Sequence, residues 1–392
     1  MSTWVGRQLV LCSAVAACSG HHAQTGDAAQ ISDGSLADSV GSDAIAIGSA
    51  CPSGATLVVD RTSCPGAIVT PPSLGSAQTG DVVSMDGLDE GDLPCLPAFV
   101  CAPGDAATML FSDSPESPAT DGVLYADTFG PGRARLYVYH VDADTNSRKF
   151  PIVALNSGAS DAHVTILREG LTAPSTDYID VGRAVAAALL GSNESTVVTV
   201  PAGTRVVLDA ALDAEHATTN QLVHAIVDVE TDAPIKFSIV SVLASEDAAA
   251  VTASLSLLPK DVDHDRGTFA HADLEVVATS TDSTASARHI RLGDGTTEPE
   301  LAGTDATTGL AATLHGNYGV AYAIAASGVS AFAASARGGA WAGAYDAIAI
   351  PTAAGGLSTT TDAIWLGSAA TFTLISGGGS SLPIDLLSIV QP

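Results

Sequence analysis

The chain has 392 residues, of which 46% are hydrophobic, so it is long enough for about two domains and can bury a substantial core. It carries 43 acidic side chains against 15 basic ones, which gives a formal net charge of −28. Such a chain repels phosphate backbones and anionic lipid head groups. This charge argues against nucleic-acid binding and against membrane docking through a basic patch.

Residues 1–17 resemble a bacterial lipoprotein signal peptide. The basic residue Arg7 precedes an apolar run over residues 9–17 that is too short to span a bilayer. The run leads into VAAC, whose cysteine, Cys18, is the residue that such a signal presents for acylation. Several acyl chains give the stable anchoring that a single chain does not. An ordinary signal peptidase site is the alternative, because residues 14–16 (AVA) also fit the pattern A-x-A.

Residues 18–50 are predicted to be a flexible tether, because they are rich in Gly, Ser, Ala and Asp and contain no aromatic residue. Such a segment buries too little apolar surface to order itself. Ser19, directly after the lipidated cysteine, favours transport onward to an outer membrane. We therefore expect a lipid-anchored protein of the bacterial envelope, on the periplasmic face of the outer membrane or at the cell surface.

Four cysteines remain for the exported body: Cys51, Cys64, Cys95 and Cys101. In an oxidising compartment they predict two disulfides, for which three pairings are open. Proximity in sequence favours Cys51–Cys64 and Cys95–Cys101. The spacings match neither a zinc knuckle nor a redox C-x-x-C motif. Because residues 51–110 are also rich in Pro and Gly, we expect them to form a small loop-rich region held by disulfides.

The rest of the chain is predicted to be all-β, with two antiparallel β-sandwich domains over residues 111–245 and 246–392. Short runs rich in Val, Ile, Thr and Tyr recur about every ten residues between turn residues. One helix interrupts the first set, with Thr176 or Asp177 as its N-cap and Gly191 as its end. An Ala-, Ser- and acid-rich joint precedes the second set. The expected strands cover residues 134–141, 150–157, 162–169, 195–201, 205–210, 222–230, 235–242, 273–280, 288–294, 318–327, 344–351, 363–367, 371–376 and 383–390.

Common catalytic motifs are absent from the sequence. It contains no G-x-S-x-G, no H-E-x-x-H and no G-x-x-x-x-G-K. Ser, His and Asp side chains can still meet in space as a triad, so a secreted hydrolase is one alternative function. Trp341 and Trp365 are candidates for a carbohydrate platform, but their apolar strand contexts favour core packing.

Two alternating acidic triplets are candidate calcium sites, because alternating carboxylates can direct several oxygens into one concavity. They are Asp261, Asp263 and Asp265 in the stretch DVDHDRGTFAHAD, and Asp142, Asp144 and Asn146 between two predicted strands. Neither fits an EF-hand, since Arg266 and Ser147 occupy the sixth position, where Gly belongs. The alternatives are a solvated domain junction for the first triplet and a polar hairpin turn for the second.

Several phrases resemble an uncharacterised group of exported bacterial proteins, some of which carry copper-amine-oxidase-like stalk domains. Among them are RLYVYH with FPIVALNSG, LTAPSTDYIDVGRAVA, RGTFAHADLEV and GGGSSLPIDLL, within roughly residues 121–392. Copper amine oxidase chemistry would need Asn-Tyr-Asp/Glu and His-x-His. Here Asn317-Tyr318 is followed by Gly319, and no His-x-His occurs. The resemblance therefore implies an exported body for attachment or envelope architecture, without oxidase chemistry.

Together these features predict a non-catalytic lipoprotein that displays β-sandwich modules for binding, adhesion or envelope architecture. Its partners would be the membrane, through the lipid on Cys18, and an envelope or extracellular ligand. Nucleic acid is not expected as a partner. A secreted hydrolase and a Ca²⁺-stabilised structural module are the alternatives, and calcium is the one cofactor that the sequence suggests.

Overall fold

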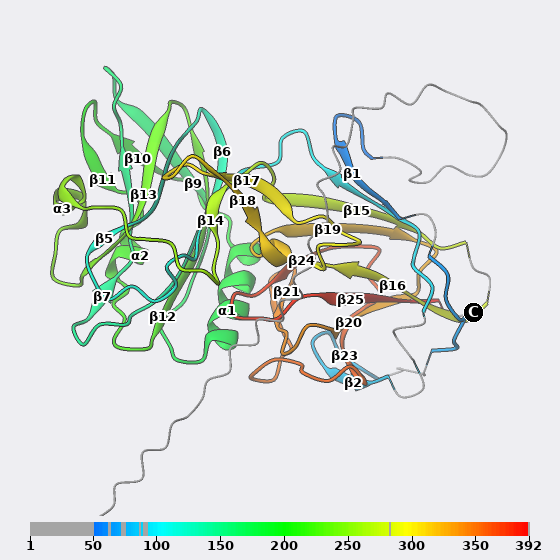
Figure 1. The fold of residues 1–392 in the computed structure, drawn as a ribbon. Coiled ribbons are helices and arrows are strands. Elements are labelled where there is room, and N and C mark those ends of the chain that lie inside the picture. The colour runs from blue at the N-terminus through cyan, green and yellow to red at the C-terminus, as the bar shows by residue number, and fades with distance from the viewer. Residues whose placement is uncertain are drawn as a thin grey trace, which may run out of the picture. The chain divides into compact units, whose positions relative to one another are not determined.

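The computed structural model describes residues 51–390 except 62–63, 72–75, 86–87, 89–92 and 282–283 (Figure 1). The predicted signal peptide and tether, with the lipidation site Cys18, lie outside the described residues. Strands make up 47% of the structure and helices 9%, which confirms the all-β class. The strands form four sheets, which pack in two pairs.

The first pair consists of an eight-stranded and a five-stranded sheet. In spatial order the eight-stranded sheet contains β10 (Thr196–Val200), β9 (Ala162–Leu171), β12 (Leu222–Thr231), β6 (Gly132–Val141), β4 (Thr108–Ser112), β14 (Arg266–Phe269), β17 (Leu301–Asp305) and β18 (Leu310–Leu314). The five-stranded sheet contains β11 (Arg205–Val207), β8 (Ile152–Leu155), β13 (Ile235–Leu243) and β5 (Gly122–Phe129), with β7 (Arg148–Lys149) paired to the end of β13.

The second pair consists of a seven-stranded sheet and another five-stranded sheet. The seven-stranded sheet contains β1 (Thr56–Arg61), β3 (Ala98–Ala102), β15 (Asp273–Thr279), β19 (Ala321–Ser327), β24 (Thr371–Ser376), β21 (Gly343–Tyr345) and β22 (Ile348–Ile350). The other contains β16 (Ser286–Leu292), β25 (Ile384–Val390), β20 (Ala331–Ala336), β23 (Asp362–Gly367) and β2 (Val82–Ser84).

The central strands β6 and β12 of the eight-stranded sheet are buried on both faces. Along β6, Leu136 and Val138 belong to the core shared with β5, β8 and β13, whereas Tyr137 and Tyr139 belong to the core shared with the second pair of sheets. A strand buried on both faces reads as a nearly continuous apolar run, as RLYVYHV does. The two sheet pairs are therefore held together by a common layer.

This sheet also crosses the domain boundary predicted near residue 245. The strands β14, β17 and β18 follow that boundary in the chain, yet they extend the sheet because β14 pairs with β4. Residues 51–110, expected as loops, supply β1, β2, β3 and the first part of β4. Two strand pairs, β4–β6 and β15–β19, are parallel, so the eight-stranded and seven-stranded sheets are mixed. The predicted boundary fails because strands from after residue 245 pair with the edge of the sheet formed by earlier strands.

The predicted helix is present as α1 (Tyr178–Gly191), and the Asp177 side chain caps it by accepting from the Asp180 N–H. Val181, Val185 and Leu189 form its buried stripe, which packs against β9 and β21. Shorter helices are α2 (Ala210–Ala214), α3 (Ala248–Val251), η2 (Thr252–Ser254) and η3 (His315–Asn317). In the described part of the chain, no helix has the length and apolar character that a membrane span requires. The strand predicted over residues 344–351 is instead the β21–β22 hairpin.

Two disulfides form, as expected, but the predicted pairing is wrong. The bonds join Cys51 with Cys101 and Cys64 with Cys95. Strand pairing explains the difference, because β1 lies antiparallel to β3 with Leu57 opposite Cys101. That register places Cys51, which precedes β1, near the C-terminal end of β3, where Cys101 lies. A pairing predicted from proximity in sequence takes no account of this long-range strand contact.

A buried arginine connects the eight-stranded sheet to the second pair of sheets. All five N–H groups of Arg135 on β6 are used. Two of them donate to Asp228 on β12, at 2.7 and 3.0 Å, and a third donates to Asp273, which begins β15, at 2.9 Å. The last two donate to the backbone carbonyls of Ala272 and Gly319, at 2.6 and 2.9 Å.

The second partner of Asp228 is Arg168 on β9, whose Nε donates at 2.9 Å. Burial opposes the charge on Asp228, but the two guanidinium groups outweigh burial and lower the pKa of this carboxyl. Directly opposite residues thus form a charged row across β6, β12 and β9.

We expect Arg135→Met to lower the free energy of unfolding by about 3–5 kcal/mol, because it leaves Asp228 buried without one of its two cations. Arg133→Met is the matched control on the same strand. Its side chain is 40% exposed and lies 4.0 Å from Asp105, so its loss should cost below about 1 kcal/mol. Urea unfolding measures both variants, and equal losses would contradict the assignment.

Candidate functional site

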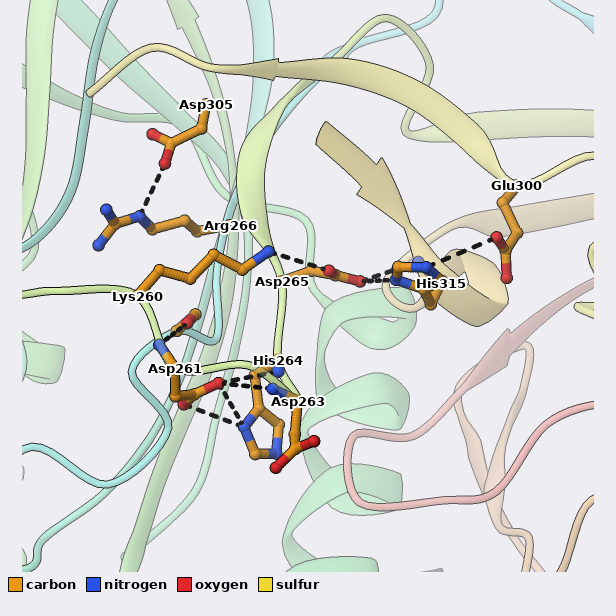
Figure 2. Close-up of polar contacts among 10 residues, drawn as sticks. Lys260, Asp261, Asp263, His264, Asp265, Arg266, Glu300, Asp305 and His315 are labelled. Carbon is orange, nitrogen blue, oxygen red and sulfur yellow. Dashed lines mark hydrogen bonds and ion pairs between the residues drawn. The ribbon is translucent and has the colours of Figure 1, made fainter. Parts of the chain in front are cut away.

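The acidic stretch before β14 packs against the loop that follows β4 (Figure 2). The backbone N–H of Asp261 donates to the Ser114 hydroxyl at 3.0 Å, and the Asp261 carboxylate accepts from the Glu116 N–H at 2.8 Å. The same carboxylate accepts from the N–H groups of Asp263 and His264, at 3.2 and 2.9 Å. Asp261 therefore closes its own turn and ties it to the neighbouring loop.

His264 lies between two carboxylates. Its Nε2 forms an ion pair with Glu116, and its Nδ1 is 3.1 Å from both Asp261 oxygens. Burial disfavours the imidazolium, but the hydrogen bonds to Asp261 and Glu116 outweigh burial and raise the pKa of His264 to about 11. The ring is thus charged at neutral pH and donates from both nitrogens. In this state it has no lone pair to accept a proton.

Asp265 belongs to a separate cluster. Its Oδ2 accepts from the backbone N–H of His315 at 2.9 Å and from the ring Nδ1 at 2.8 Å. Its Oδ1 is 3.5 Å from the Lys260 ammonium, and His315 Nε2 is 4.0 Å from Glu300. Figure 2 shows Asp261 and Asp265 directed toward these different partners.

The first acidic triplet therefore does not converge. Asp261 and Asp265 have separate partners, and Asp263 is exposed. Within the described ranges, no three His, Cys, Asp or Glu side chains are grouped so as to hold a metal ion. Calcium binding by Asp261, Asp263 and Asp265 stays a prediction, and it would require two carboxylates to leave their present partners.

The second triplet lies in the turn from β6 to β7, which join different sheets, so the turn is not a hairpin. The Asp142 carboxylate accepts from the Asp144 N–H at 2.8 Å. Asp144 in turn pairs with Arg148 at 2.8 Å and accepts from the Asn146 amide at 3.4 Å. Calcium binding here also stays a prediction, one in which the metal competes with Arg148.

The structure also brings together a serine and a histidine that sequence reasoning missed. His140 Nε2 is 2.9 Å from the Ser112 hydroxyl, and His140 Nδ1 is 2.9 Å from the Pro115 carbonyl oxygen. Burial lowers the pKa of His140 to about 3, so the ring is neutral. Its Nδ1–H donates to the carbonyl, and its Nε2 accepts from the hydroxyl. Both side chains are fully buried.

This pair follows from the parallel alignment of β4 and β6, in which Ser112 is opposite Val138. No motif in the sequence signals it, because the two residues are 28 positions apart. The arrangement resembles two members of a hydrolytic triad. It differs because a backbone carbonyl replaces the carboxylate that orients the histidine, and because solvent reaches neither side chain.

One oxygen of a buried carboxyl beside His264 has no hydrogen-bond partner among the described residues. The Oδ1 atom of Asp113 is buried and has no hydrogen bond within the described part of the chain. Burial raises the pKa of Asp113 well above its usual range, although the charge of His264 opposes this shift. Burial therefore favours the protonated form of Asp113.

The tryptophans differ in burial. Trp341 is fully buried and its Nε1–H donates to the Ser376 hydroxyl at 3.1 Å, which confirms core packing there. Trp365 on β23 is partly buried and packs against a smaller apolar cluster.

Comparisons with known proteins identify no family. No family model matches the chain, and no curated protein matches it. Among solved structures, the crystal structure of PBSX exported protein XepA is 12% identical and aligns over 85% of this chain and 98% of that chain, with a TM-score of 0.12. A likeness at that score carries no argument about fold or function. The two disulfides by themselves indicate an extracytoplasmic location.

The charge of His264 predicts a pH-dependent contribution to stability. A folded pKa near 11, above the unfolded value of about 6.5, gives stabilisation that is complete below pH 6.5 and declines as the pH rises toward 11. We expect His264→Gln to cost at least about 2 kcal/mol at pH 6 and progressively less at pH 8 and pH 10.

His163→Gln is the matched control for this prediction. His163 also pairs with an aspartate, Asp232, at 2.9 Å, but both side chains are at least half exposed. We expect a change below about 0.5 kcal/mol at each pH. Urea unfolding at the three pH values measures both differences. A constant difference between wild type and the His264 variant would contradict the assigned charge.

Proposed function

We propose that the chain is a lipid-anchored protein of the bacterial envelope that displays its β-sheet body for binding or adhesion and catalyses no reaction. One observation carries the non-catalytic part. Two groups of catalytic-type side chains, His264 with two carboxylates and Ser112 with His140, have their hydrogen-bonding groups engaged inside the protein. The anchoring part is supported by the lipoprotein-like sequence that ends at Cys18 and by the extracytoplasmic disulfides.

The anchor is tested by expressing the full chain in a Gram-negative host and analysing the membrane fraction. We expect an N-terminal peptide that begins at Cys18 and carries acyl chains, because only a multiply acylated cysteine holds such an acidic protein on a membrane. Mass spectrometry identifies this peptide. Cys18→Ser is the control and should release the protein into the soluble fraction. A cleaved but unacylated N-terminus would refute the anchor.

A secreted hydrolase is the second candidate, because Ser112 and His140 are within hydrogen-bonding distance, at 2.9 Å. A fluorophosphonate probe, which labels activated serines, separates the two proposals. We expect no labelling of the native protein, because Ser112 is fully buried. Labelling that disappears in Ser112→Ala would favour the hydrolase and overturn the non-catalytic proposal.

A further inference from the structure

Most of the arginine and lysine side chains that the structure describes form ion pairs with acidic residues. Buried examples are Arg135 with Asp228 and Arg266 with Asp305. Two cationic side chains differ. The side chain of neither Arg205 nor Lys236 forms a hydrogen bond or an ion pair with any residue that the structure describes. In a chain with 43 acidic residues, two described cationic side chains with neither a hydrogen bond nor an ion pair are an exception.

These two cations lie in the same row of one sheet. Leu155 on β8 is directly opposite Arg205 on β11 and directly opposite Lys236 on β13. Residues opposite one another in neighbouring strands share a face of the sheet, and adjacent strands are about 4.8 Å apart. The two backbone positions are therefore about 10 Å apart, within reach of one small ligand for two such long side chains.

The row borders a pocket of about 180 Å³. Arg205 and Lys236 line it on one side, and Thr252, Ala253 and Leu255 of η2 and the following turn line the other. At about 30 Å³ for each water, this volume holds about six water molecules, or one small anion with part of its hydration shell.

A hydroxyl group completes the polar lining. Ser238 lies two residues after Lys236 on β13, so it faces the same side of the sheet. It lines the pocket and is only 5% exposed, and its side chain has no hydrogen bond to the described residues. The Ser238 hydroxyl and the two cationic side chains can all donate hydrogen bonds, and no acceptor for them is present among the described residues.

From this juxtaposition we infer that the pocket between η2 and the β11–β8–β13 strands binds an oxyanion, a carboxylate or a phosphate group. The Arg205 guanidinium offers a planar fork for two oxygens, Lys236 supplies a second charge, and Ser238 donates from the floor. Binding would relieve the repulsion between the two cations. The inference deepens the proposed binding role by naming a ligand class, and it rests on that role only for its biological use.

The test is a titration of the purified full-length protein with inorganic phosphate and, separately, with acetate, at constant ionic strength made up with chloride. We expect saturable binding with a Kd of about 1 mM for at least one anion, seen by calorimetry and as a rising melting temperature. A response to phosphate or to acetate identifies which oxyanion the pocket prefers.

Matched variants assign the site. We expect Arg205→Gln with Lys236→Gln to weaken binding at least tenfold and Ser238→Ala to weaken it severalfold. Arg133→Gln, which changes a cation outside the pocket, should leave binding unchanged. Because Arg205 and Lys236 are exposed, we expect the double variant to keep its melting temperature in chloride. An absence of saturable binding up to about 10 mM, or equal binding by the double variant, would overturn the inference. Neither result depends on whether Cys18 is acylated.

Discussion

The buried guanidinium of Arg135 is the constraint on which the architecture depends. Removing such a group from water is costly unless every donor finds an acceptor. Here all five donors do so, and the acceptors come from β12 and from the backbone and side chains that begin β15 and precede β19. Any rearrangement of the second pair of sheets relative to β6 would leave buried donors unpaired. The charge thus defines how the two halves meet.

Close backbone contact at helix α1 reinforces this junction. A Cβ atom on Gly182 would lie 1.8 Å from the Gly378 carbonyl oxygen, and one on Gly378 would lie 2.7 Å from the Tyr139 ring. Only glycine at both positions lets the helix and the GGG turn approach this closely. The helix therefore packs between β9 of the first pair of sheets and β21 of the second. The glycine triplet serves helix packing as well as chain reversal.

Some charged groups of this protein are used to hold the fold together, and others have no partner within the described residues. The stretch DVDHDRG, with its aspartates and histidine, is the most polar motif in the sequence, yet its groups bind one another and the loop after β4. An ion-paired histidine such as His264 stabilises the fold and has no free nitrogen for chemistry. Arg205 and Lys236, by contrast, belong to no conspicuous motif, and they lie without a side-chain partner among the described residues on exposed positions of two strands.

Much of the secondary structure could be predicted from the sequence, because it depends on interactions between residues close together in the chain. The alternation in DLEVVAT matches the alternating burial along β15, and Asp177 and Gly191 define α1, because these signals act within a few residues. Only the tertiary structure determined which strands are neighbours. The disulfide partners, the sheet shared by β4 and β14, the Ser112–His140 contact and the separation of Asp261 from Asp265 all depend on registers between distant segments. Such registers arise from the packing of whole sheet faces, which no short stretch of sequence encodes.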